Sequence, residues 1–253
     1  MTVAPTRPPQ KPARISIRTL TRALTALGLH DHSRVIVHTA PLALRQAGIH
    51  VETFLGALLQ RAELVMMTGF TPQTMVTPRT GPPNNGLDYN APHDNSFAEF
   101  WRADLPVDPN LGPLPERFRC LPDTRISLHP VLRFLARGPQ AQAALATQTL
   151  TDPLAPLRWL TNHDGQVLLV GATPRDNFSL HLALHMAERN GYQRWALARD
   201  RVVTVPNFPV EADRLAELAS HLNDLTHEQQ VGALPLVCLP LAPAIERCQQ
   251  LLG

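Results

Sequence analysis

The chain is nearly without lysine. Its 23 basic residues are almost all arginines, Lys11 being the only lysine, and 21 acidic residues bring the net charge to +2. The basic side chains are spread along the sequence and form no stripe or cluster. Nucleic-acid-binding proteins concentrate positive charge on one face, so this distribution predicts no nucleic-acid partner.

Cysteine and long apolar runs are also scarce. The three cysteines, Cys120, Cys238 and Cys248, form neither a disulfide framework nor a zinc motif, and they fit a reducing compartment. The sequence has no run of about 18 apolar residues, so we expect no membrane span. Residues 1–14 lack the apolar centre of a signal peptide and are expected to form a flexible tail. The expected location is the cytoplasm.

Several catalytic motifs are absent as well. The sequence holds no Gly-x-Ser-x-Gly nucleophile elbow, no Walker loop and no Gly-x-Gly-x-x-Gly dinucleotide fingerprint. These absences argue against hydrolase, kinase and dehydrogenase activities. A transferase that activates its acceptor with a general base needs none of these motifs.

Apolar periodicity indicates an ordered α/β protein. Helical and strand-like segments alternate along residues 15–253, a pattern typical of one domain with a central, largely parallel or mixed sheet flanked by helices. The predicted elements are helices at 15–27, 51–61, 178–189 and 242–252, and strands at 35–37, 64–68, 167–170 and 236–239. Residues 71–108, rich in Pro, Asn, Gly and Asp, are expected to form a long loop. Such a loop is either functional or a surface insertion.

Polar side chains follow two of the predicted strands. His38 and Thr39 end the first, while Asp176, Asn177 and His181 follow the strand at 167–170. Sites in open α/β sheets form at the carboxyl ends of strands, so these residues are candidates for one site. The alternative for Asn177 or Ser179 is a simple helix cap.

Two histidines suit proton transfer near neutral pH. Pro130 disfavours helical geometry at His129, which favours a loop or strand end, and His181 lies near the start of a helix. His185 shares the helix face of His181, a spacing that also suits zinc. Leu182 stands where the zinc-protease glutamate would be and a third ligand is not evident, so we expect no metal.

Five segments together resemble the aminoglycoside 3-N-acetyltransferase family. The segments are His38-Thr-Ala-Pro-Leu42, Gly112-Pro-Leu-Pro-Glu-Arg-Phe-Arg119, Arg125-Ile-Ser-Leu-His-Pro130, Leu168-Leu-Val-Gly171 and Phe178-Ser-Leu-His-Leu-Ala-Leu184. Their order and spacing match the family from about Leu20 to the C-terminus. The resemblance implies an acetyl-CoA-dependent N-acetyltransferase with a small-molecule amine acceptor, an aminoglycoside being one candidate.

The resemblance also suggests roles for individual residues. Catalytic candidates are His129, His181 and Glu116; coenzyme-binding candidates are His38, Thr39, Arg125 and Ser127; acceptor-binding candidates are Asp176 and Asn177. An aminoglycoside acceptor further predicts carboxylates facing the acceptor groove, with Asp88, Asp94, Glu99, Asp104 and Asp176 as candidates. No membrane partner is expected, and a homodimer is left open.

The sequence departs from the family at the expected site. The family glutamate three residues after His181 is Leu184, with Glu188 one turn further on, and family serines are replaced by Ala40 and Arg133. Three hypotheses follow: an N-acyltransferase with a non-aminoglycoside acceptor, a catalytically degenerate relative that binds a ligand or partner, and a metal enzyme built on His181 and His185.

Overall fold

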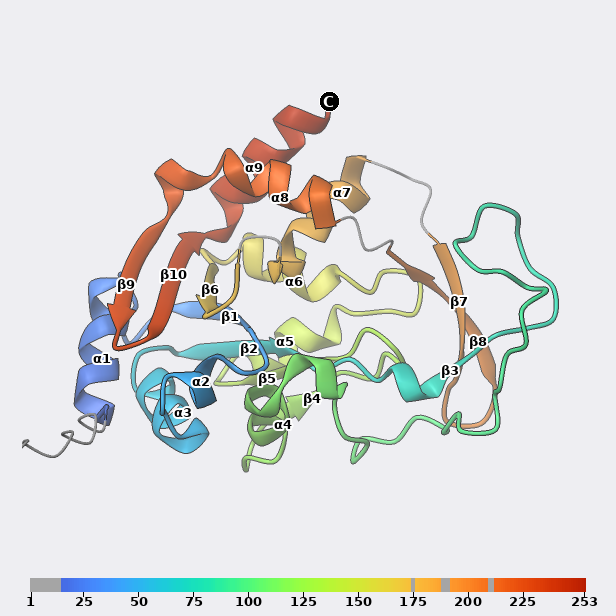
Figure 1. The fold of residues 1–253 in the computed structure, drawn as a ribbon, viewed down its shortest axis with the longest axis horizontal. Helices are drawn as coiled ribbons and strands as arrows, with labels where there is room; N and C mark the ends of the chain where they lie inside the picture. Colours follow the sequence, from blue (N-terminus) through green and yellow to red (C-terminus); the bar gives the residue numbers. More distant parts are fainter. Residues whose placement is uncertain (1–14, 174–175, 188–191, 209–211) are drawn as a thin grey trace, which may run out of the picture.

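A seven-stranded mixed sheet forms the centre of the protein (Figure 1). The computed structural model describes residues 15–173, 176–187, 192–208 and 212–253. In spatial order the strands are β4 (Arg125–Ile126), β5 (Phe134–Arg137), β2 (Leu64–Thr68), β1 (Arg34–Thr39), β6 (Gln166–Val170), β10 (Leu234–Pro240) and β9 (His227–Val231). This sheet confirms the predicted mixed α/β architecture.

Only the middle of the sheet is parallel. β1 pairs in parallel with β2 on one side, with Val37 opposite Met67, and with β6 on the other, with Thr39 opposite Val170. All other pairs in the sheet are antiparallel. β2 is buried at every position, which explains its continuous apolar run.

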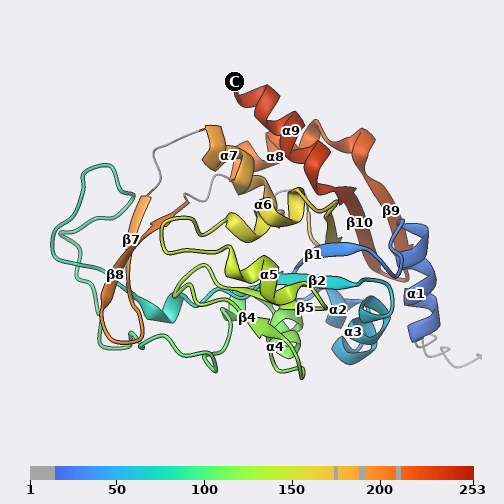
Figure 2. The ribbon, with the colours of Figure 1, turned by 180° about the vertical axis from the view of Figure 1, so that it is seen from behind.

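Two helical layers cover the two faces of the sheet (Figures 1 and 2). The first layer is α1 (Ile17–Ala26), α2 (Ala43–Gln46), α3 (Val51–Leu59) and α4 (Pro113–Arg119). The second is α5 (Ala141–Ala146), α6 (Ala155–Thr161), α7 (His181–Ala187), α8 (Ala212–Ser220) and α9 (Leu241–Leu252). Alternate side chains of β1 serve the two layers, because Val35 and Val37 join the first core and Ile36 the second.

A second, antiparallel sheet that the sequence analysis did not predict lies to one side of the first (Figure 1). Its order is β3 (Met75–Val76), β7 (Tyr192–Leu197) and β8 (Val202–Asn207). Residues 77–108 run beside this sheet and are hydrogen-bonded to it. The side-chain amide of Asn85 exchanges hydrogen bonds with the Gln193 backbone. The backbone N–H of Trp101 donates to the Leu197 carbonyl at 2.9 Å. The predicted loop at 71–108 therefore contains a short strand.

Several element boundaries differ from those expected. The helix predicted at 178–189 begins as a 3-10 turn, η4 (Phe178–Leu180), and continues as α7 only from His181. Glu188 and the predicted tail at 1–14 lie outside the described residues. None of the helices in the described part of the chain is both long and apolar enough to span a membrane.

Candidate active site

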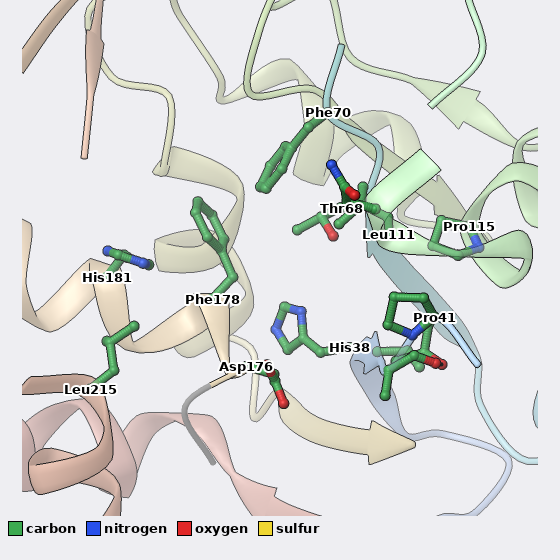
Figure 3. A pocket seen from close by; sticks show the side chains of 14 residues that line it. His38, Pro41, Thr68, Phe70, Leu111, Pro115, Asp176, Phe178, His181 and Leu215 are labelled. Atoms are coloured by element: carbon green, nitrogen blue, oxygen red, sulfur yellow. The ribbon is translucent and has the colours of Figure 1, made fainter. Parts of the chain in front are cut away.

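A cavity of about 270 Å³ lies at the carboxyl ends of β1 and β2, beside α7 and α8 (Figure 3). The strand-end rule predicted this position. The lining residues are Val37, His38, Thr39, Ala40 and Pro41; Thr68 and Phe70; Asn110, Leu111 and Pro115; and Asp176, Phe178, His181 and Leu215. Four of the residues selected from the sequence, His38, Thr39, Asp176 and His181, are thus brought together from two distant segments.

His38 points from β1 toward the start of α7. Its Nε2 lies 2.9 Å from the Ser179 hydroxyl oxygen, a contact buried in the protein. Burial lowers the pKa of His38 to about 3; the charge of Asp176 opposes this shift and His181 adds to it. The imidazole is therefore neutral at pH 7 and free to act as a hydrogen-bond acceptor at one ring nitrogen.

His181 opens α7 and is held by aromatic rings. Its ring centroid lies 4.9 Å from that of Phe178 and 6.0 Å from that of Phe208. Burial lowers the pKa of His181 to about 4, so this ring is also neutral at pH 7. Among the described residues neither ring nitrogen has a hydrogen-bond partner, which leaves both available to a ligand in the cavity.

Asp176 and Asn177 shape the turn before α7. The Asp176 carboxylate accepts hydrogen bonds from the backbone N–H and the hydroxyl of Thr173, both at 2.7 Å, and the residue is exposed at the cavity rim. The Asn177 side chain is buried and caps η4 by accepting from the Ser179 N–H at 3.1 Å. The cap that the sequence analysis offered as an alternative for Asn177 is therefore present, and an acceptor contact stays a prediction.

Glu116 lies on α4 and is not part of the cavity wall. Its carboxylate accepts from Arg119 at 2.6 and 3.0 Å and from the Val107 N–H at 3.0 Å. Burial raises the pKa of Glu116, but these hydrogen bonds more than offset that effect and hold the pKa below its usual value. Through the hydrogen bond from Val107, Glu116 joins the end of the long loop to α4. Its catalytic role stays a prediction.

His129 is likewise outside the cavity lining. Its Nδ1 accepts from the N–H groups of Leu132 at 2.9 Å and Val131 at 3.2 Å, so the ring proton must be on Nε2. Burial lowers the pKa of His129 to about 4, and the backbone of Leu150 opposes the shift. These contacts fix the turn that leads into β5, and a direct catalytic role stays a prediction.

The other two coenzyme-binding candidates do not line the cavity either. The Ser127 hydroxyl is buried and accepts from the Phe134 N–H at 2.8 Å, whereas Arg125 is exposed on β4. Sequence reasoning missed the aromatic wall of Phe70 and Phe178, whose rings meet edge to face at 4.8 Å. Their apolar character gave no signal that separates a cavity wall from ordinary core.

The loop carboxylates expected to face the acceptor are used locally. Asp88 and Asp94 accept from the N–H groups of Asn90 and Ser96. Glu99 and Asp104 form ion pairs with Arg102 at 3.3 and 3.2 Å. Asp176 is the single carboxylate that lines the cavity within the described part of the chain.

The third ligand required by the metal hypothesis is not found in the described part of the chain, where no group of three His, Cys, Asp or Glu side chains is placed to hold an ion. His185 lies one turn beyond His181, with its ring 5.1 Å from Phe208. It does not line the cavity.

A buried arginine supports the cavity wall from behind. Arg133 is fully buried and donates to the carbonyls of Gly69 at 2.7 Å and Leu105 at 3.0 Å, which joins the end of β2 to the long loop. Burial lowers the pKa of Arg133 to about 10, so it stays charged at pH 7.

We expect Arg133→Ser to lower the free energy of unfolding by about 3 kcal/mol or more, because it leaves two buried carbonyls unpaired and opens a void. Arg133→Met, which keeps the volume, should cost less. Urea unfolding of the two variants checks the order; equal losses would show that the void adds nothing.

Comparisons with known proteins point to one family. Residues 36–253 match the family model described as aminoglycoside 3-N-acetyltransferase. The chain is 34% identical over 180 residues to aminoglycoside N(3)-acetyltransferase IX of Micromonospora chalcea, and 32% identical over 187 residues to aminoglycoside N(3)-acetyltransferase VII of Streptomyces paromomycinus. These alignments cover 65% and 68% of this chain and 58% and 61% of the relatives, so the chain spans about three fifths of their length.

Solved structures share the whole fold. The binary complex of AAC-IIIb with CoASH superposes with a TM-score of 0.77 at 20% identity, covering 95% of this chain and 97% of the other. The apoenzyme of aminoglycoside acetyltransferase AAC(3)-IVa gives 0.76 at 24% identity, covering 97% and 91%. The fold, the family model and the sequence relatives agree, and the chain belongs to the aminoglycoside 3-N-acetyltransferase family.

Proposed function

We propose that the protein is an acetyl-CoA-dependent N-acetyltransferase that acts on a small-molecule amine. The observation that carries the proposal is the pair of neutral, buried imidazoles, His38 and His181, in one cavity at the strand ends. A neutral imidazole can take a proton from an amine as the amine attacks a carbonyl carbon. The coenzyme, when bound, supplies the acetyl thioester, whose C–S bond breaks as the C–N bond forms.

His181 is the better placed of the two to act as the base. His38 already uses Nε2 with Ser179, whereas both ring nitrogens of His181 are without a partner among the described residues. His38 and Thr39, on the opposite wall, are placed to orient the reacting carbonyl. The amine attacks the thioester directly, so the enzyme forms no covalent intermediate, and the thiolate leaving group takes up the proton from the His181 imidazolium.

A second groove fits the phosphate-bearing end of the coenzyme. It has a volume of about 530 Å³ and, like the cavity, is lined in part by α4: Pro115 lines the cavity, whereas Pro113 and Arg117 line the groove. Arg45 and Arg117 line it, and Arg117 also pairs with Glu52 at 3.2 Å. The first turn of α3 begins there with no side-chain cap on its N–H groups. Guanidinium groups and free helix N–H groups suit phosphate oxygens.

Calorimetric titration with acetyl-CoA tests the proposal. We expect binding in the micromolar range, weakened about tenfold or more in Arg45→Gln because a charge-assisted hydrogen bond is lost. Acetyl-pantetheine, which lacks the nucleotide, serves as the matched ligand and should bind both proteins equally. No binding of acetyl-CoA would refute the proposal.

The competing function is a degenerate relative that binds a ligand without chemistry. One observation favours it: Leu184, one turn after His181, is packed in the apolar core and offers the base no carboxylate. Release of free thiol from acetyl-CoA in the presence of an amine separates the two, since the degenerate protein releases none.

A further inference from the structure

We infer that the acceptor is an amine with one positive charge and a flat apolar body, such as an arylalkylamine, and not a polycation. The inference rests on the proposed transferase activity and specifies its acceptor. Three properties of the cavity carry it: its apolar wall, the single carboxylate among its described lining residues, and its size.

The wall opposite β1 is aromatic and aliphatic. Phe70 and Phe178 meet edge to face at 4.8 Å (Figure 3), and Leu111 and Leu215 also line the cavity. Phe178 also contacts the ring of His181, so a ring packed against it would place its substituent beside the base. Aromatic groups stack favourably on such a surface, whereas hydroxylated sugar rings would leave their polar groups without partners.

The Asp176 carboxylate at the cavity rim can bind one ammonium group. Asp176 is exposed at the rim and faces His38, whose pKa responds to the Asp176 charge. Within the described part of the chain no other carboxylate lines the cavity, and Glu99 and Asp104 are already paired with Arg102. A polycation would bring several ammonium groups to one carboxylate and lose hydration without compensation.

The volume of the cavity also indicates a small acceptor. Sites that bury drug-sized ligands have volumes of roughly 300–1,000 Å³. The cavity measures about 270 Å³ and must hold the reacting end of the thioester as well as the amine. The part of the acceptor that enters it is therefore small.

Thiol-release kinetics at saturating acetyl-CoA test the inference with three probes. 2-Phenylethylamine has the ring and one charge, ethylamine has the charge alone, and kanamycin is a polycation. We expect kcat/KM for 2-phenylethylamine to exceed that of each other probe by about tenfold or more.

Two variants assign the contacts. Phe178→Leu should raise KM for 2-phenylethylamine several-fold more than it raises KM for ethylamine, because only the former has a ring to pack against Phe178. Asp176→Asn keeps an acceptor for Thr173, so it should raise KM roughly tenfold with kcat nearly constant. Added salt should raise KM in the parent protein and not in Asp176→Asn, a difference that a purely structural role of Asp176 would not produce.

The outcomes separate failure of the acceptor inference from failure of the proposed function. A higher kcat/KM for kanamycin than for 2-phenylethylamine overturns the acceptor inference and leaves the transferase intact. A protein that binds acetyl-CoA but acetylates none of the probes also overturns the inference. Absence of acetyl-CoA binding in the calorimeter refutes the proposed function itself, so the two failures are distinguishable.

Discussion

Replacing His181 by asparagine is expected to lower kcat for amine acetylation about 10²- to 10⁴-fold, the usual contribution of a general base. The ring lies in the cavity, is neutral above about pH 4 and has no competing hydrogen bond among the described residues. Asparagine keeps polarity but cannot take the proton. Steady-state thiol release gives the ratio of kcat values, while calorimetry with acetyl-CoA should show unchanged binding.

His185→Asn is the matched control for this variant. It alters a histidine one turn further along α7 that does not line the cavity, and we expect less than about a threefold change in kcat. If kcat fell equally in the two variants, the cause would be damage to α7 and not the loss of a base. A pH profile adds a second check: with a base this weakly basic, activity between pH 6 and 9 should follow the ionisation of the amine acceptor alone.

The folded protein should lose a large part of its stability between pH 7 and pH 5. Burial holds the pKa of His38 at about 3 and those of His129 and His181 at about 4, against about 6.5 in the unfolded chain. The unfolded chain therefore binds more protons in this window, and stability falls as pH falls. Each imidazole contributes about 2 kcal/mol that is present above pH 6.5 and lost by pH 5, about 6 kcal/mol together, against a typical total of about 5–15 kcal/mol.

Urea unfolding at pH 7.5, 6 and 5 measures this loss. His129→Asn provides the control, because the amide oxygen can still accept from Leu132 while the side chain no longer titrates. Its free energy of unfolding should depend on pH by about one third less than that of the parent protein. His129→Leu removes the acceptor as well and should be less stable at every pH. Identical pH dependence in the parent and His129→Asn would contradict the explanation.

Only part of the fold was readable from the sequence. The apolar runs of β1, β2 and β6 are buried on both sides, and this local pattern was sufficient to predict them. β9, with the sequence His-Glu-Gln-Gln-Val, has no such pattern and is a strand because β10 pairs with it. β3 and β7 were missed for the same reason, since they lie in polar or loop-like segments; β3 pairs with β7, and β7 pairs along its length with β8.

The candidate site, like the fold, was only partly readable from the sequence. The sequence by itself determined that His38, Thr39, Asp176 and His181 follow buried strands, and the parallel pairing of β1 with β6 then brings them to one edge. Whether a histidine faces a cavity or a backbone turn was decided by the tertiary structure alone. His129 and His181 are both buried with lowered pKa values, yet one accepts from two backbone N–H groups and the other lines the cavity.

The tertiary structure also decided which carboxylates remain available. The pair of Glu116 with Arg119 lies within one helical turn, and the loop carboxylates bind residues two or three positions away. Sequence position could not show that Glu116 also accepts from the Val107 N–H, because this contact depends on how the long loop folds back on α4. Strand ends are set by local apolar pattern, which is why the sequence located the site. Its apolar shape comes from the side chains of Phe70, Phe178 and Leu215, whose positions depend on packing between distant segments.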